Sequence, residues 1–132
     1  MKRCTLLLLL LPALVSAQTK RSEPLFEQAV EKSIVGQYEE AVKLLHKAVD
    51  IDPGYAEAWL LLGNQHLALQ EYDKAVESYD KCLAIKPLSK RWQDEASRNR
   101  QTAQWRQQAM ANPVPFRPVN LGPNVNSAYD EY

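Results

Sequence analysis

Two stretches of this chain decide its fold when one is written above the other: QYEEAVKLLHKAVDIDP at residues 37–53 and EYDKAVESYDKCLAIKP at residues 71–87. They align without a gap, 34 residues apart, so that Tyr38 matches Tyr72 and Ala41 matches Ala75. Self-similarity at a fixed period of this size is typical of helical repeats that stack on one another. The sequence therefore predicts a repeat array.

Each repeat unit has the pattern of two helices joined by a tight turn. Ala41, Leu45 and Ala48 recur at helical intervals, Gly36 breaks the chain before them, and Pro53 ends the helix after them. The small side chains allow two helix axes to approach closely. We expect an all-α fold.

This pattern resembles the tetratricopeptide repeat. The residues that stand at positions of the family's signature are Gly36, Tyr38, Ala41, Ala48, Pro53, Trp59, Leu62, Gly63, Ala75, Tyr79, Cys82 and Pro87. His66 departs from it, because the family usually has a tyrosine there. The resemblance covers residues 22–87 and implies two units, at 22–55 and 56–89, in a right-handed superhelix.

Two units alone would leave an apolar face open, so the sequence must also provide a cap. Residues 89–111 carry a helical pattern, and Ser89 is placed to cap its first turn. The predicted inner face of this capping helix holds Leu88, Trp92, Ala96, Ala103 and Met110.

The outer face of the predicted capping helix is basic, with Arg91, Arg98, Arg100 and Arg106. Together with Trp92 and Trp105 these arginines could hold single-stranded nucleic acid. Acidic neighbours dilute the patch, and the 16 basic residues of the chain are balanced by 16 acidic ones. We therefore expect a solvated face and no nucleic-acid partner.

The first residues, MKRCTLLLLLLPALVSAQ, have the form of a secretory signal. Lys2 and Arg3 precede a short apolar run, and small residues lead to a cleavage point after Ala17. The run is too short to span a bilayer. We expect a signal peptide at 1–17, an exported mature chain without a transmembrane segment, and a repeat domain at 18–111.

No pattern of catalytic or metal-binding residues is found. Removal of the signal peptide leaves Cys82 without a second cysteine, inside a helical pattern, and His46 and His66 lie on different predicted helices. No glycine-rich phosphate loop accompanies them. We expect no enzyme, no metal, no cofactor and no small-molecule substrate.

The family resemblance implies a concave surface, lined by the first helix of each unit, on which a peptide or a partner helix lies. The positions that face it are Phe26, Val30, Ile34, Leu60, Asn64 and Leu67. One subclass of the family uses lysine and asparagine at the first two positions to clamp terminal carboxylates, and neither is present here. Ligand contact and core packing against the capping helix are both open for this stripe.

Residues 112–132 differ in composition from the rest and are rich in proline and asparagine. After a predicted linker, NLGPNVNSAYDEY at 120–132 resembles the start of a WD-like β-propeller of exported proteins. The matching residues are Asn120, Leu121, Gly122, Asn126, Asp130 and Tyr132. A disordered tail is the alternative.

Exported repeats that lead into such a propeller resemble envelope proteins of diderm bacteria, which commonly end in an OmpA-like, peptidoglycan-binding domain. Some of those proteins assist type IX secretion and gliding. The resemblance implies a non-catalytic scaffold in the periplasm, near the outer membrane, with a protein or peptide partner of the envelope. Two alternatives are a free-standing secreted repeat protein with a disordered tail and a targeting module for a downstream enzyme domain.

Overall fold

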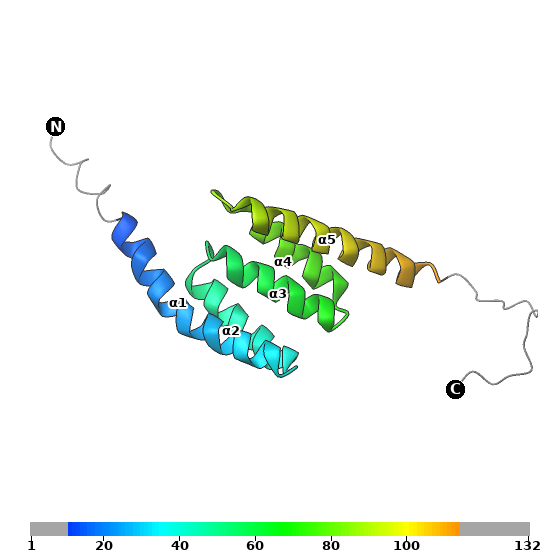
Figure 1. Ribbon diagram of the computed structural model, residues 1–132, viewed down its shortest axis with the longest axis horizontal. Helices are drawn as coiled ribbons and strands as arrows, with labels where there is room; N and C mark the ends of the chain where they lie inside the picture. The colour runs from blue at the N-terminus through cyan, green and yellow to red at the C-terminus, as the bar shows by residue number, and fades with distance from the viewer. Residues whose placement is uncertain (1–10, 114–132) are drawn as a thin grey trace, which may run out of the picture.

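The structure of the chain, a computed structural model, describes residues 11–113 and the side chains of residues 21–113. Within this range it consists of helices and turns, without strands. The helices are α1 (Leu11–Ile34), α2 (Tyr38–Ile51), α3 (Ala56–Ala68), α4 (Tyr72–Ala84) and α5 (Lys90–Ala111). Figure 1 shows them stacked side by side, with α3 in the middle and α5 along one side. The predicted all-α class is confirmed.

The helices pair as the repeat predicts. α1 packs on α2 and α3 on α4, while α5 covers α4 and also touches α3. α2 and α4 begin at Tyr38 and Tyr72, which are equivalent positions, and both helices end before the prolines at 53 and 87. The predicted signal peptide lies partly in α1 and partly in residues 1–10, outside the described residues. The predicted linker and propeller segment, from residue 114 on, also lie outside them.

The turns inside the two units have the same backbone geometry. Gly36 has φ 76° and Gln70 has φ 61°, so both occupy the left-handed region. The amide of Gln37 donates to the carbonyl of Lys32 at 2.9 Å, and the amide of Glu71 donates to that of His66 at 2.9 Å. This is the Schellman ending of a helix, which reverses the chain sharply.

The core forms where small and large residues alternate between helices. Ala41, Leu45 and Ala48 are fully buried between α1, α2 and α3. The equivalent residues Ala75, Tyr79 and Cys82 are fully buried in a second cluster that includes residues of α5. These small residues therefore have the packing role that their spacing predicts.

Trp59 ties the two units together at their junction. Its Nε1 donates to the carbonyl oxygen of Pro53 at 2.9 Å, and the Lys81 ammonium lies 4.8 Å from the centre of its ring. One side chain thus contacts the α2–α3 turn and α4. Its half-buried indole supplies apolar area, a hydrogen bond and a cation–π contact at one place.

The capping helix agrees with the prediction at its start and departs from it later. The Ser89 hydroxyl accepts from the amide of Trp92 at 3.3 Å, and Ala96 and Ala103 are fully buried. Met110 was predicted to face inward, but it is 63% exposed. It lies past the last buried residue of α5, beside the first turn of α4, where little remains to cover it.

Arg100 was predicted to point outward, and this is wrong. Its Nε donates to Asp80 Oδ1 on α4 at 2.5 Å, so the side chain reaches along the helix interface. The Arg100 side chain is half-buried in this position. Among residues 11–113, no helix has both the length and the apolar character needed to span a bilayer.

Candidate functional site

The first helix of each unit and the capping helix share a hollow of about 260 Å³ on one side of the stack. We call it the inner groove. α1, α3 and α5 contribute its walls, as expected for the concave face of such an array. The lining residues are Phe26, Val30, Glu57, Leu60, Leu61, Asn64, Trp92 and Glu95.

Four of the six predicted contact residues lie in the inner groove: Phe26, Val30, Leu60 and Asn64. The other two do not. Ile34 ends α1 and is 79% exposed, away from the groove. Leu67 packs against the core cluster around Tyr79.

Leu60 has both of the roles that the sequence left open. It lines the groove, yet it is only 6% exposed and belongs to the second core cluster. Val30 is half-buried and belongs to neither core cluster, so a substitution there changes the groove with less effect on the core than one at Leu60.

Sequence reasoning missed Leu61, Trp92, Glu57 and Glu95 as groove residues. Trp92 was assigned to the capping helix alone, although its ring both packs on the core and lines the groove. Leu61 adjoins the predicted Leu60, so the apolar run at 60–62 was an available signal. Nothing in the local sequence indicated that the two glutamates face one hollow.

The floor of the inner groove is held by a hydrogen-bond network around Asn64. Its Oδ1 accepts from the Tyr79 hydroxyl at 2.8 Å and from Asn99 Nδ2 at 3.0 Å. These bonds join α3, α4 and α5. Burial raises the pKa of Tyr79, which keeps its hydroxyl protonated and able to donate. Asn64 therefore shapes the groove as well as lining it.

Phe26, which lines the groove, also packs against Tyr55, the residue before α3. The centres of the Phe26 and Tyr55 rings lie 5.0 Å apart with the planes tilted by 44°. Burial raises the pKa of Tyr55 to about 12, and the carboxylates of Glu57, Glu23 and Glu27 act in the same direction. The groove is thus bordered by negative charge on α1 and α3.

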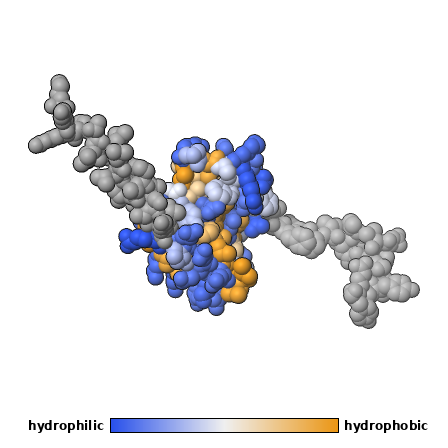
Figure 2. Space-filling model, turned by 60° about the vertical axis from the view of Figure 1, so that its left-hand side comes forward, coloured by the Kyte–Doolittle hydropathy of each residue, from blue (hydrophilic) through white to orange (hydrophobic). Residues whose placement is uncertain are grey.

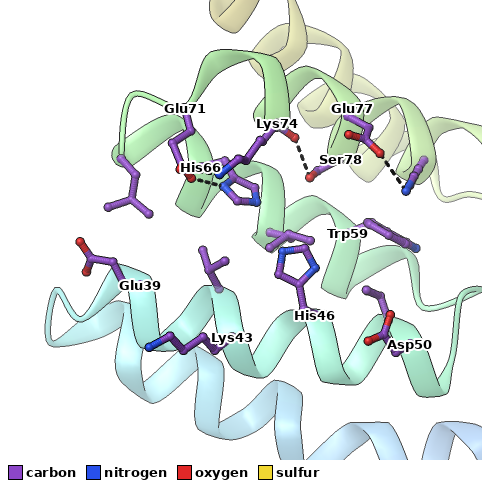
Figure 3. Close-up of a pocket in the computed structure, with 15 residues that line it drawn as sticks. Glu39, Lys43, His46, Asp50, Trp59, His66, Glu71, Lys74, Glu77 and Ser78 are labelled. Atoms are coloured by element: carbon purple, nitrogen blue, oxygen red, sulfur yellow. Dashed lines mark hydrogen bonds and ion pairs between the residues drawn. The ribbon is translucent and has the colours of Figure 1, made fainter.

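A second hollow, the outer cleft, lies on the opposite face of α3, between α2 and α4, with a volume of about 540 Å³. Figure 3 shows His46 on α2 facing His66 on α3, with charged side chains around them. The two imidazole centres are 5.9 Å apart, and His66 Nδ1 lies 2.7 Å from Glu71 Oε2. Sequence reasoning placed the histidines on different helices and did not bring them together.

Several charged groups on the α4 side of the outer cleft pair with each other. Glu71 also accepts from Lys74 Nζ at 2.6 Å, and Lys81 pairs with Glu77 at 3.0 Å. Burial lowers the pKa of His66, although its bond to Glu71 acts in the opposite direction. Among the residues whose side chains are described, no three His, Cys, Asp or Glu side chains are arranged to hold a metal ion.

Cys82 lies in the second core cluster and is fully buried. Burial raises the pKa of its thiol, and the nearby Glu95 carboxylate adds to this effect. The protonated thiol is a poor nucleophile. Its position is that of a small core residue.

Apolar side chains are also exposed outside the inner groove. Figure 2 shows one face of the molecule, where hydrophilic side chains predominate and hydrophobic ones form separate patches. Large exposed apolar side chains include Ile34 and Val35 at the end of α1, and Trp105 and Met110 on α5. The first pair lies at a turn and the second on the outer part of the cap.

Comparisons with known proteins agree with this geometry. A family model for the tetratricopeptide repeat matches residues 35–94. Anaphase-promoting complex subunit 3 of Schizosaccharomyces pombe is 30% identical over 53 residues, which are 40% of this chain and 8% of that protein. An uncharacterised protein of Methanocaldococcus jannaschii is 32% identical over 69 residues, which are 50% of this chain and 77% of that protein.

Solved structures with the same fold include the tetratricopeptide domain of Sgt2 from Aspergillus fumigatus. It superimposes with a TM-score of 0.63 at 24% identity, over 79% of this chain and 69% of that one. A structure of MamA superimposes with a TM-score of 0.51 at 24% identity, over 68% and 60% of the two chains. The repeat spacing, the helix pairs and these matches agree, and the chain belongs to the tetratricopeptide repeat family.

Proposed function

We propose that this chain is a non-catalytic scaffold of the bacterial cell envelope that holds an apolar segment of a partner protein in its inner groove. Tetratricopeptide arrays serve as protein interaction scaffolds, because stacked repeats present an extended surface. The observation that supports this site is that α1, α3 and α5 each place apolar side chains in one hollow.

The composition of the groove fits a peptide or a partner helix. Phe26, Leu61 and Trp92 are half-buried and apolar, so they still have surface to remove from water. A few such anchors carry most of the energy of an interface. The Asn64 Oδ1 is already occupied, but no bond of its Nδ2 group is found among residues 21–113, which leaves a donor for a peptide carbonyl.

The assignment to the envelope is supported by two segments of sequence. Residues 1–17 have the order of a secretory signal, and residues 120–132 resemble the start of an exported propeller. Both segments support a scaffold in the periplasm beside the outer membrane, in the context of type IX secretion or peptidoglycan anchoring. The coding frame after Tyr132 distinguishes this from the alternatives, since propeller blades, a stop codon or a catalytic domain would follow.

The groove itself is tested by two arginine substitutions on the same helix. Val30→Arg puts a charge into the hollow, whereas Ile34→Arg puts the same charge one turn later on an exposed position. Peptides selected from a displayed library on the wild-type chain would be measured against both variants by calorimetry. Circular dichroism would first show that both variants are folded.

We expect Val30→Arg to weaken binding of the selected peptides by tenfold or more, because the long arginine side chain occupies the hollow and its displacement or desolvation costs about 2 kcal/mol. Ile34→Arg should leave their affinity within about twofold of the wild type. Peptides that bind both variants as well as the wild type would place the interaction surface outside the inner groove.

A further inference from the structure

Two carboxylates line the inner groove, and no lysine or arginine among the residues with described side chains lines it with them. Glu57 on α3 and Glu95 on α5 are both half-buried, and both line the hollow. No ion pair of either one is found among residues 21–113, and no lysine or arginine belongs to the lining. The groove therefore combines apolar side chains with unneutralised negative charge.

Other carboxylates of the described chain do have a cation within 4 Å of an oxygen atom. The pairs are Lys32 with Glu40, Lys74 with Glu71, Lys81 with Glu77, Lys90 with Asp94 and Arg100 with Asp80. Glu57 and Glu95 are less exposed than most of these acids, so water solvates them less and an opposite charge would interact with them more strongly.

The negative charge continues beyond the hollow. Glu23 and Glu27 lie on α1, and together with Glu57 they act on Tyr55, whose ring packs against Phe26 of the groove. A field of one sign along a concave, low-dielectric surface concentrates ligands of the opposite sign. A ligand with an acidic terminus would meet like charge along this whole edge.

We infer that the partner of the inner groove is a cationic apolar segment: a helix or strand whose Leu- or Phe-like side chains enter the hollow and whose Lys or Arg side chains pair with Glu57 and Glu95. This inference rests on the proposed function of the groove and adds the charge of its ligand. Apolar contact holds the segment, and the two carboxylates select it by charge, since an acidic segment would be repelled.

Three matched peptides test the inference. They share the same pattern of Leu and Phe and differ only in the flanking residues, which are Lys in one, Gln in the second and Glu in the third. Dissociation constants are measured by calorimetry on the full chain at low and high salt. The variants are Glu57→Gln/Glu95→Gln and, as a control with the same loss of charge, Glu39→Gln/Glu77→Gln in the outer cleft on the opposite face of α3.

The wild type should bind the Lys peptide about tenfold more tightly than the Glu peptide, and salt should reduce this ratio. Glu57→Gln/Glu95→Gln should remove most of the preference, while the control double variant keeps it. Because glutamine is nearly isosteric with glutamate, the first variant is expected to fold, and Glu57→Lys/Glu95→Lys should reverse the preference.

The outcomes separate the charge of the ligand from the existence of the site. If all three peptides bind the wild type equally and all lose affinity in Val30→Arg, the groove is real and the inferred charge selection is wrong. If no peptide binds, or if binding ignores Val30→Arg, the proposed groove itself is overturned. A Lys preference that survives in Glu57→Gln/Glu95→Gln also contradicts the inference.

Discussion

The ring of Tyr79 lies directly against the backbone of Gly63, so closely that no other residue fits there without movement. A Cβ atom at Gly63 would stand 2.5 Å from Tyr79 Cε1 and 2.8 Å from Cζ. The ring of Tyr79 on α4 thus fills the space that a side chain at Gly63 on α3 would occupy. The same repeat positions in the first unit hold Ala29 and Leu45, which are both fully buried. The first unit thus has an alanine and a leucine where the second unit has a glycine and a tyrosine.

Gly63→Ala should therefore destabilise the chain, although alanine is the better helix former. We expect a loss of about 1 to 3 kcal/mol in the free energy of unfolding, because the added methyl group overpacks the α3–α4 contact. Urea unfolding followed by circular dichroism measures it. Gly63→Ala/Tyr79→Leu recreates the pair of the first unit, and in that background the alanine should no longer destabilise. An equal loss in both backgrounds would contradict the assigned contact.

The turn residues Gly36 and Gln70 should respond to substitution in opposite directions. Both have a left-handed backbone, which glycine adopts without strain and other residues adopt at a cost. Gly36→Ala should lower the free energy of unfolding by about 1 kcal/mol, from backbone strain alone, because nothing lies within 4 Å of the added Cβ. Gln70→Gly should raise it by up to about 1 kcal/mol. Thermal melts of the two variants test the pair, and a loss in Gln70→Gly would argue against strain at this turn.

Ser89 caps the last helix and should contribute more to stability than a serine in the middle of it. Ser89→Ala removes the bond from the Trp92 amide and should cost about 1 kcal/mol. Ser97→Ala is the matched control, since its exposed hydroxyl only bonds the Gln93 carbonyl one turn back on the same helix. Chemical unfolding of both variants gives the comparison. Similar losses at the two positions would mean that Ser89 does not cap α5.

Acidification should weaken the fold through His66. Burial holds the pKa of this imidazole below its ordinary value of 6.5, against the effect of its bond to Glu71. Between the lowered pKa and 6.5 the unfolded chain therefore binds more protons than the folded chain. The contribution of neutral His66 to the free energy of unfolding is complete above pH 6.5 and is lost progressively as the pH falls below it.

The measurement is the melting temperature from about pH 7.5 to about pH 5.5, a range above the titration of most carboxyl groups. His66→Gln should flatten the decline, because an amide takes up no proton. His46→Gln, which changes the exposed partner ring 5.9 Å away, is the control and should keep the decline. The assignment to His66 is wrong if its variant and the wild type show the same slope.

Export should shorten the chain at its N-terminus. When it is produced in a diderm bacterium, we expect mature protein in the periplasmic fraction to begin at Gln18, as mass spectrometry of the N-terminal peptide would show. Such cleavage removes residues 11–17 of α1 and leaves Leu25, Phe26 and Ala29, which pack on the first core cluster. Ala17→Trp should block the processing, because signal cleavage requires small residues. Recovery of intact Met1 from the periplasm would remove the basis for export.

The repeat and its helices could be predicted from sequence because their signals are local. The 34-residue offset aligns Tyr38 with Tyr72, and both residues begin the second helix of a unit. Proline ends a helix by its own covalent structure, and small residues at helical spacing mark the side on which another helix packs. Neither signal depends on which other helix packs at that position. The fold class followed from them.

The residues of the groove could be predicted from the sequence only in part. A helical period indicates which residues share a face of the helix, but it does not indicate which element covers that face. Phe26 and Val30 line the hollow, whereas Ile34, on the same stripe, is exposed at the end of α1. Leu67 packs inward, and Arg100 reaches to Asp80 across the α4–α5 interface. These outcomes depend on the length of each neighbouring helix and on how it lies against the next.

By itself the sequence determined the repeat, its turns and its family, since these depend on residues close together in the chain. Only the tertiary structure decided the chemistry of the groove. Glu57 and Glu95 lie on different helices, and no local pattern links them. They face one apolar hollow because the packing of α3, α4 and α5 fixes the rotation of each helix, and that rotation is set by contacts such as Tyr79 against Gly63.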